Sequence, residues 1–159
     1  MIGKETINDD KFLSIIGAVS ALTNGIFKFF FAVSLDYISF KRCFGTLSII
    51  YLLCIIFMKT AAESRTGFLI VTVMSFSLDG AISSMMPVLV FKIYGAVNGP
   101  RVYSYIYSVY FIGTFSFVAT MWFINDDDNY DILIYMSIVL VTLSFILTIS
   151  LDEKPFVLK

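Results

Sequence analysis

The chain has 159 residues, of which 58% are hydrophobic and only 14% are charged. Soluble domains average about 45–50% apolar and about 25% charged residues, so this composition, with a mean hydropathy of +0.89, indicates a membrane protein. The net charge of −1 excludes the basic surface that nucleic-acid binding requires, and the absence of histidine restricts any metal site to carboxylates or the two cysteines.

Five apolar segments are each close to the length of about 20 residues that a helix needs to cross a bilayer. Polar connections separate them, and helices are the only open structure that satisfies every backbone amide inside lipid. We therefore predict an all-α, polytopic membrane protein with five transmembrane helices. The predicted spans are residues 12–35, 43–62, 67–91, 102–124 and 132–151.

The first span contains Lys28 within the run GIFKFFFAVS. A charge near the bilayer centre costs about 2.5–3.5 kcal/mol on insertion scales, so such residues usually face protein or water. Snorkelling of the long side chain to the membrane surface is the alternative. A stripe of small or polar residues favours the first reading, because small residues allow close helix approach. The stripe consists of Gly17, Ala21, Asn24 or Gly25, Lys28 and Ala32.

The second span contains both cysteines, Cys43 and Cys54. Eleven residues of helix separate them by about 16 Å, which excludes a disulfide within that helix. We interpret them as small apolar helix residues.

The third span contains a carboxylate, Asp79, near its middle, and Gly80 and Pro87 weaken the helix around it. Thr72, Ser75, Ser83 and Met86 share its predicted face. Two interpretations stay open. Asp79 either neutralises Lys28 as a structural pair or carries a proton.

The fourth span begins RVYSYIYSVYFIG, which places Tyr103, Tyr107 and Tyr110 at helical spacing. Tyr103 fits the aromatic belt at a membrane interface. Tyr107 and Tyr110 lie deeper, where their hydroxyls either face a cavity or take part in ordinary helix packing.

The fifth span completes a chain whose termini lie on opposite sides of the membrane. Cytoplasmic loops carry an excess of Lys and Arg. One side would hold Lys41, Arg42, Lys92, Arg101, Lys154 and Lys159, and the other Lys4, Lys11, Lys59 and Arg65. This bias of six to four favours a cytoplasmic C-terminus and places the acidic run 126–128 outside, as a solvated loop.

The stretch TNGIFKFFFAVSLDYISFKR resembles the eighth helix and following loop of major facilitator transporters, within the oxalate/formate antiporter and monocarboxylate transporter group. Asn24, Gly25 and Lys28 match the group's Asn-Gly-x-x-Arg. Asp36, Lys41 and Arg42 match its Gly-x-x-x-Asp-x-x-Gly-Arg-Lys loop, although Ala32, Ser39 and Phe40 stand where Gly, Gly and Arg are usual. MMPVLVFKIYG resembles the group's Pro-x-Leu-Val and aromatic-Gly pair.

The resemblance implies that the chain is the last five helices of a twelve-helix fold, a partial C-terminal bundle over residues 1–159 whose N-terminal half is a missing partner. It implies that Lys28 and Asn24, with Tyr107 and Tyr110, contact a small carboxylate anion, and that Asp36, Lys41 and Arg42 form a cytoplasmic gate. A monocarboxylate is favoured over oxalate, because the helix carrying the family's second cation has none here. Asp79 remains the proton-coupling residue or the charge partner.

Two functions therefore remain open. The first is a fragment of a secondary active transporter for small carboxylate anions, and the alternative is a non-transporting membrane protein that acts as an assembly or regulatory subunit. An enzyme is not expected, because the sequence has no metal-ligand cluster, nucleophile elbow or phosphate loop. We expect the lipid bilayer and a small organic anion as partners, and no cofactor, metal or nucleic acid.

Overall fold

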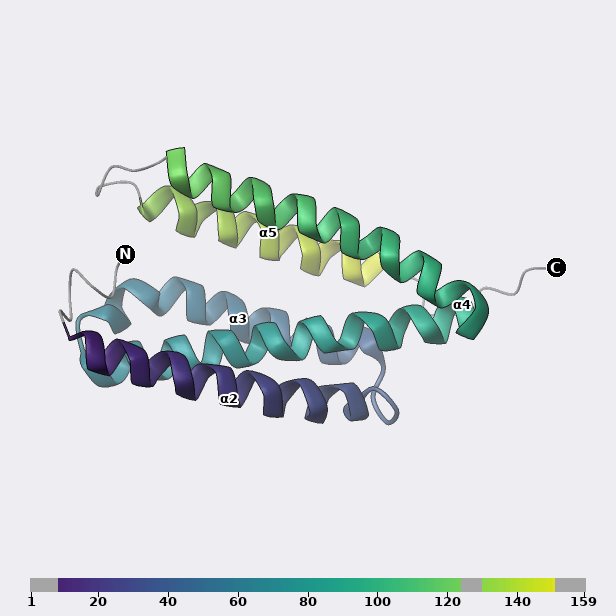
Figure 1. Cartoon of the computed structure of the whole chain (residues 1–159), viewed down its shortest axis with the longest axis horizontal. Coiled ribbons are helices and arrows are strands. Elements are labelled where there is room, and N and C mark those ends of the chain that lie inside the picture. Colours follow the sequence, from purple (N-terminus) through teal and green to yellow (C-terminus); the bar gives the residue numbers. More distant parts are fainter. Residues whose placement is uncertain (1–8, 124–129, 151–159) are drawn as a thin grey trace.

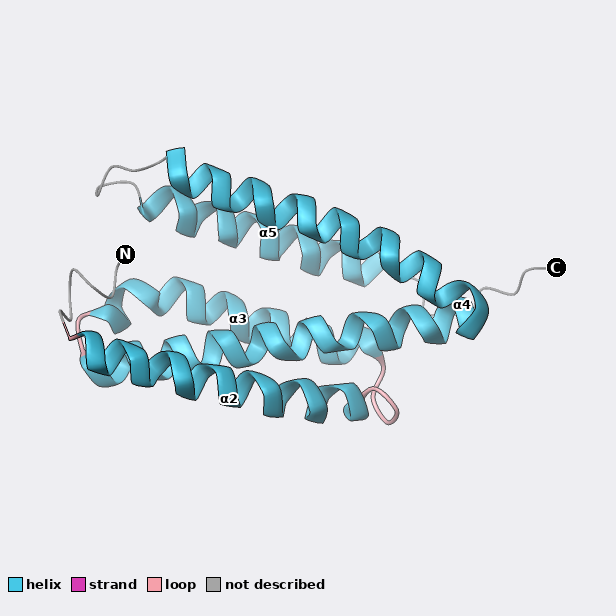
Figure 2. Ribbon diagram, viewed as in Figure 1, coloured by secondary structure: helices cyan, strands magenta, loops and turns pink. Residues whose placement is uncertain are grey.

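The computed structural model describes residues 9–123 and 130–150, and this part of the chain consists of helices joined by short turns (Figure 1; Figure 2). The helices are α2 (Asp10–Ser34), α3 (Phe40–Ala62), α4 (Arg65–Phe123) and α5 (Tyr130–Ser150). All four contain stretches long and apolar enough to cross a membrane. For the described residues, the prediction of an all-α fold with several helices long and apolar enough to span a membrane is confirmed.

The predicted third and fourth spans lie within one helix, α4, rather than in two helices separated by a loop. Gly95, with φ 73° and ψ 178°, is the non-helical residue inside α4, and only glycine adopts that conformation at low cost. Figure 1 shows α4 turning back on itself at the right-hand end of the molecule. Helix α4 therefore has two limbs, residues 65–94 and 96–123. The connection predicted between the third and fourth spans, residues 92–101, is therefore reduced to a sharp kink at Gly95.

Side chains at the helix ends explain where α2 and α4 begin. The Phe12 amide donates to the Asp9 carboxylate at 3.1 Å, which makes Asp9 the N-cap of α2. The Gly67 amide donates to the Ser64 hydroxyl at 3.0 Å in the same way at the start of α4. These caps satisfy amides that the first helical turn leaves without partners.

Helix α2 and the first limb of α4 lie side by side and run in the same direction. At their starts, Arg65 forms an ion pair with Asp9 at 3.2 Å. At their ends, the Lys92 ammonium donates to the Leu35 carbonyl and pairs with Asp36 at 3.4 Å. The starts and the ends of the two helices are thus held level with each other.

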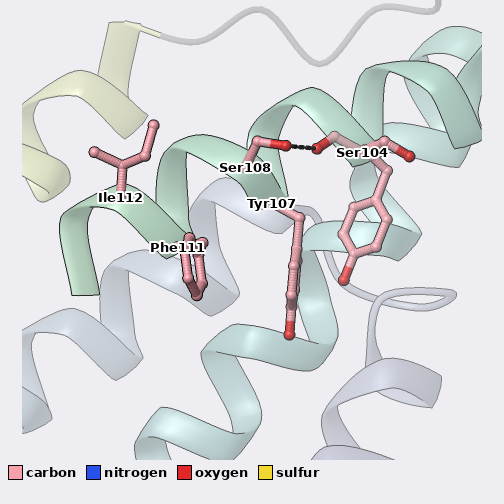
Figure 3. Close-up of a pocket in the computed structure, with 6 residues that line it drawn as sticks. Ser104, Tyr107, Ser108, Phe111 and Ile112 are labelled. Carbon is pink, nitrogen blue, oxygen red and sulfur yellow. Dashed lines mark hydrogen bonds between the residues drawn. The ribbon is translucent and has the colours of Figure 1, made fainter. Parts of the chain in front are cut away.

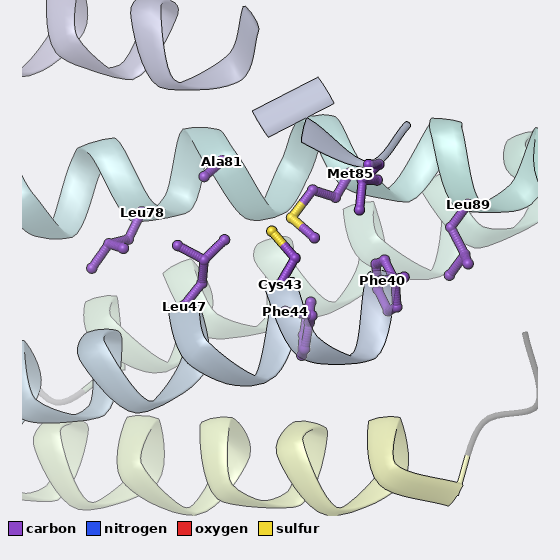
Figure 4. Packing of buried hydrophobic residues seen from close by; sticks show 9 residues of the cluster. Phe40, Cys43, Phe44, Leu47, Leu78, Ala81, Met85 and Leu89 are labelled. Atoms are coloured by element: carbon purple, nitrogen blue, oxygen red, sulfur yellow. The ribbon is translucent and has the colours of Figure 1, made fainter. Parts of the chain in front are cut away.

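The buried core lies mainly between α3 and the first limb of α4 (Figure 4). Met85, Ala81 and Leu78 of α4 are at most 2% exposed. They face a row on α3 formed by Cys43, Phe44 and Leu47. Phe27 and Phe31 of α2 pack against this cluster. Helix α3 contacts α5 as well as α4, so it packs against two neighbouring helices.

Parts of the sequence-based predictions fall outside the described residues. They include the acidic run 126–128, the last residue of the fourth span and of the fifth, and Lys154 and Lys159. The orientation of the C-terminus and the placement of the acidic run therefore stay predictions.

Candidate functional site

Lys28 on α2 and Asp79 on α4 lie about one helical turn apart along the helix pair. Asn24 on α2 contacts Phe76 and Gly80 on α4, which puts Asn24 near the level of Asp79. Because the two helices run in parallel, Lys28 lies about one turn beyond that level. The Asp79 carboxylate is within electrostatic range of the Lys28 ammonium, but no ion pair joins them among the residues of the structure. Both residues are exposed on the surface of the chain.

The face of α2 that packs against the other helices overlaps only in part with the predicted stripe. The packing row contains Ile16, Ser20 and Leu35, which are buried, with the partly buried Phe27 and Phe31 between them. Gly17 and Gly25 of the predicted stripe have nothing within 4 Å of an added Cβ, whereas Asn24 packs against α4. Within the described chain, only part of the stripe therefore contacts another helix. Lys28 lies at the border between the packed row and the uncovered stripe.

Asn24 has a structural role that the sequence did not indicate. Its amide nitrogen donates to the Phe76 carbonyl of α4 at 2.6 Å. The approach is close because the facing residue is Gly80, where an added Cβ would lie 2.7 Å from the Asn24 carbonyl oxygen. The glycine that permits close helix approach is thus Gly80 on α4, not a glycine on α2. One donor of the predicted substrate residue Asn24 is already engaged in packing.

A tyrosine on α3 joins the site from a position that sequence analysis missed. The Tyr51 hydroxyl is within electrostatic range of Asp79 and of Tyr110. Tyr51 is partly buried against the core cluster. The one available signal was a hydroxyl-bearing ring in the middle of an apolar span. Pairwise electrostatic interactions therefore run from Lys28 to Asp79, from Asp79 to Tyr51 and from Tyr51 to Tyr110.

The second limb of α4 presents a row of tyrosines. The ring centroids of Tyr103 and Tyr107 are 5.4 Å apart, and those of Tyr107 and Tyr110 are 5.7 Å apart. A shallow, open hollow lies beside Tyr103 and Tyr107, and Tyr110 is not among its lining residues (Figure 3). Tyr107 and Tyr110 are 57% and 58% exposed, so within the described chain they are not ordinary packing residues.

Two of the predicted gate residues, Asp36 and Lys41, make separate contacts at the end of the bundle where α2 ends. Asp36 pairs with Lys92, a residue not predicted for this group. The Lys41 ammonium donates to the Ile149 carbonyl at 2.9 Å and so ties the start of α3 to the end of α5. Arg42 is exposed. The sequence signal that could have identified Lys92 was its position as a basic residue directly after the third predicted span.

The described residues contain no group of three or more carboxylates or cysteines that could hold a metal ion. Cys43 and Cys54 are free thiols, and Cys43 lies in the packed core.

Comparisons with protein-family models, with curated proteins and with solved structures find no match for the chain. The resemblance to major facilitator transporters therefore stays a prediction from the quoted motifs.

Proposed function

We propose that this chain carries the anion-binding part of a secondary active transporter for small carboxylate anions. The observation that supports this proposal best is the position of Lys28. Its ammonium lies within an apolar span, on an exposed part of α2, and beside a carboxylate that does not hold it in an ion pair. A cation retained at this depth is a functional-site candidate by default, because lipid alone would penalise it.

In this proposal Lys28 attracts the substrate carboxylate, and Asp79 adjusts the affinity or accepts a proton when the anion arrives. Lysine presents a point charge rather than the bidentate fork of arginine, which suits one carboxylate group better than the two of oxalate. The Tyr51 hydroxyl, which is within electrostatic range of Asp79, supplies a hydrogen-bond donor in this proposal.

The finer architecture belongs to the same proposal. The two limbs of α4 act as separate membrane passes, which makes five passes with α2, α3 and α5. The end that carries Asp36, Lys92 and Lys41 faces the cytoplasm, following the excess of basic residues there. The Asp36–Lys92 pair then acts as part of a gate between two conformations.

Transport by reconstituted protein tests the proposal. Purified full chain is inserted into proteoliposomes, and uptake of radiolabelled lactate is followed under an imposed pH gradient. Binding of lactate to the same preparation is measured in parallel. Lys28→Ala should weaken binding by about tenfold to a hundredfold, since a hydrogen bond to a charged group contributes about 1.5–3 kcal/mol.

The matched control is Lys11→Ala, because Lys11 is the other lysine of α2 and lies in its first turn. This variant should bind and transport as the unchanged chain does. Equal lactate binding by the Lys28→Ala protein, or no binding by the unchanged chain, would contradict the proposal.

The uncovered second limb of α4 favours a second candidate function, a non-transporting assembly or regulatory subunit. None of the residues 100–120 that the structure describes is buried, and a partner helix would cover them. The double variant Lys28→Asp/Asp79→Lys separates the two functions. A subunit that needs only the charge pair should assemble normally after the exchange, whereas a transporter should not recover lactate uptake.

A further inference from the structure

The two ends of the helix bundle differ in charge. At the end where α2 stops and α3 starts, on the right in Figure 1, Asp36 is the one acidic residue among the described side chains. The basic residues at this end are Lys41, Arg42, Lys92 and Arg101. At the opposite end, basic and acidic side chains balance. They are Lys11, Lys59 and Arg65 against Asp9, Asp10 and Glu63. Positive charge is therefore in excess at one end only.

The turn between α2 and α3 exposes apolar side chains at this basic end. Tyr37 is 87% exposed and Ile38 is 48% exposed. Helices α2 and α3 are each long and apolar enough to cross a membrane, so the turn that joins them is expected at a membrane surface. Tyrosine is enriched there, because its ring is apolar and its hydroxyl reaches water. The turn is therefore suited to the headgroup layer of a bilayer.

A small recess lies beside this turn, between the end of α2, the start of α3 and the first limb of α4. Its volume is about 100 Å³. The residues that line this basic recess are Leu35, Ile38, Ser39, Phe40, Leu89 and Lys92. The lining is apolar except for one hydroxyl and one ammonium group. Such a combination fits a ligand that is itself polar at one end and apolar at the other.

The two polar groups of the basic recess can hold a phosphate. The Lys92 ammonium has three donors. It donates to the Leu35 carbonyl and pairs with Asp36 at 3.4 Å, which leaves one donor for a further acceptor. The Lys92 side chain is 49% exposed, so a ligand can reach it. Ser39 makes no side-chain capping hydrogen bond at the start of α3, and its hydroxyl can donate to the same phosphate.

We propose that the basic recess binds the phosphate of an anionic phospholipid, with the apolar lining against the glycerol and the first acyl carbons. This inference goes beyond the transporter proposal and does not depend on it. Lysine is a common phosphate ligand. Arg42 and Arg101, both exposed at the same end, favour an anionic headgroup over one that also carries an ammonium. Each basic residue near a membrane surface strengthens anionic-lipid binding by roughly fivefold.

Lipid association in vesicles tests the inference. The purified full chain is reconstituted in phosphatidylcholine with traces of spin-labelled phosphatidylglycerol or spin-labelled phosphatidylcholine. Electron paramagnetic resonance measures the fraction of each label that the protein immobilises. Phosphatidylglycerol should be preferred, and Lys92→Gln should reduce the preference by about two- to fivefold. Asp36→Asn breaks the same ion pair but leaves the ammonium charged, so it should raise the preference.

The opposite signs separate lipid binding from a structural role of the ion pair. Equal losses in Lys92→Gln and Asp36→Asn would overturn the inference, as would no preference for phosphatidylglycerol by the unchanged chain. Lys11→Gln, at the balanced end of α2, is the matched control and should keep the full preference. A loss there equal to that of Lys92→Gln would assign the preference to general surface charge and overturn the inference.

A last arm distinguishes the lipid from a free phosphate ion. Inorganic phosphate, added at matched ionic strength, should leave the immobilised fraction of phosphatidylglycerol unchanged. Displacement of the labelled lipid would assign the basic recess to a free anion and overturn the lipid assignment.

Discussion

Two regions of this chain have similarly apolar sequences but differ in how they pack. In the first region, α2, α3 and the first limb of α4 share a buried core around Met85 and Ala81, both 0% exposed. In the second, the other limb of α4 and α5 leave nearly every described side chain at the surface, with Leu133 the one buried residue of the described α5 side chains. Hydrophobicity alone does not produce the difference.

Small residues and interhelical hydrogen bonds explain why the first region packs and the second does not. Lipid tails are as apolar as leucine, so membrane helices associate through close packing and polar contacts. The first region has Gly80 opposite Asn24, a hydrogen bond between the two helices and an ion pair at each end. The second limb has bulky rings along its length. The packed region therefore works as a scaffold, and the uncovered limb is free to meet a ligand or a partner.

The largest expected effect is in the core of the packed region. Met85→Ala should lower the free energy of unfolding by about 2–5 kcal/mol, because the cavity left behind loses packing contacts. Phe115→Ala on the second limb, where the side chain is 67% exposed, should change it little. Steric-trapping measurements in bicelles give both values. Similar losses for the two variants would mean that the regions do not differ in packing.

A glycine pair gives the next largest contrast. Gly80→Ala should destabilise the chain by about 1–3 kcal/mol, because its Cβ would lie 2.7 Å from the Asn24 carbonyl oxygen and push the helices apart. Gly113→Ala adds a methyl group with nothing within 4 Å and should be neutral or stabilising. The same unfolding assay checks both variants. A stable Gly80→Ala chain would show that α2 and α4 do not approach this closely.

The interhelical hydrogen bond should contribute less. Asn24→Ala removes the donor to the Phe76 carbonyl and should cost about 0.6–2 kcal/mol, the range for such bonds in membranes. Thr23→Ala is the control, since the Thr23 hydroxyl donates to carbonyls of its own helix. If both variants lose the same stability, the Asn24 contact has no special role in joining the helices.

The smallest effect should come from the ion pairs at the helix ends. Asp9→Asn and Asp36→Asn each break an exposed pair and should cost about 0.2–1 kcal/mol, decreasing further at high salt. Loss of stability beyond that range at the Asp36–Lys92 end would indicate a second function for that contact, as the proposed gate requires.

The sequence was sufficient to locate the helices, but it was not sufficient to identify which face of each helix packs against the others. Runs of about 20 apolar residues located α2, α3 and α5, and the break near Gly95 was expected within a few residues. The packed face of α2 was predicted only in part, because two neighbouring rows both contain small or polar residues. One row holds Ser20 and Asn24 and the other Ala21 and Gly25, and only the position of Gly80 on another helix decides between them.

The candidate site was predicted in part for the same reason. Lys28 and Asp79 stand out because charges are rare in apolar spans. Tyr51 and Lys92 gain their importance from residues far away in the sequence, Asp79 and Asp36. Each has only a weak local signal, a ring hydroxyl within an apolar span for Tyr51 and a basic side chain at the end of one for Lys92, and neither signal identifies the residue it contacts.

The most direct test of the central claim asks whether water reaches the Lys28 position. In a parent protein with Cys43→Ala and Cys54→Ala, the variants Lys28→Cys and Phe30→Cys are exposed to a membrane-impermeant thiol reagent in proteoliposomes. A cysteine cannot snorkel as a lysine does, and the reactive thiolate forms where water and polar groups stabilise charge. We expect Lys28→Cys to react readily. Phe30 is 62% exposed and lies on the apolar side of α2, so we expect Phe30→Cys to stay unmodified. Equal protection of both positions would place Lys28 in lipid and contradict the anion site.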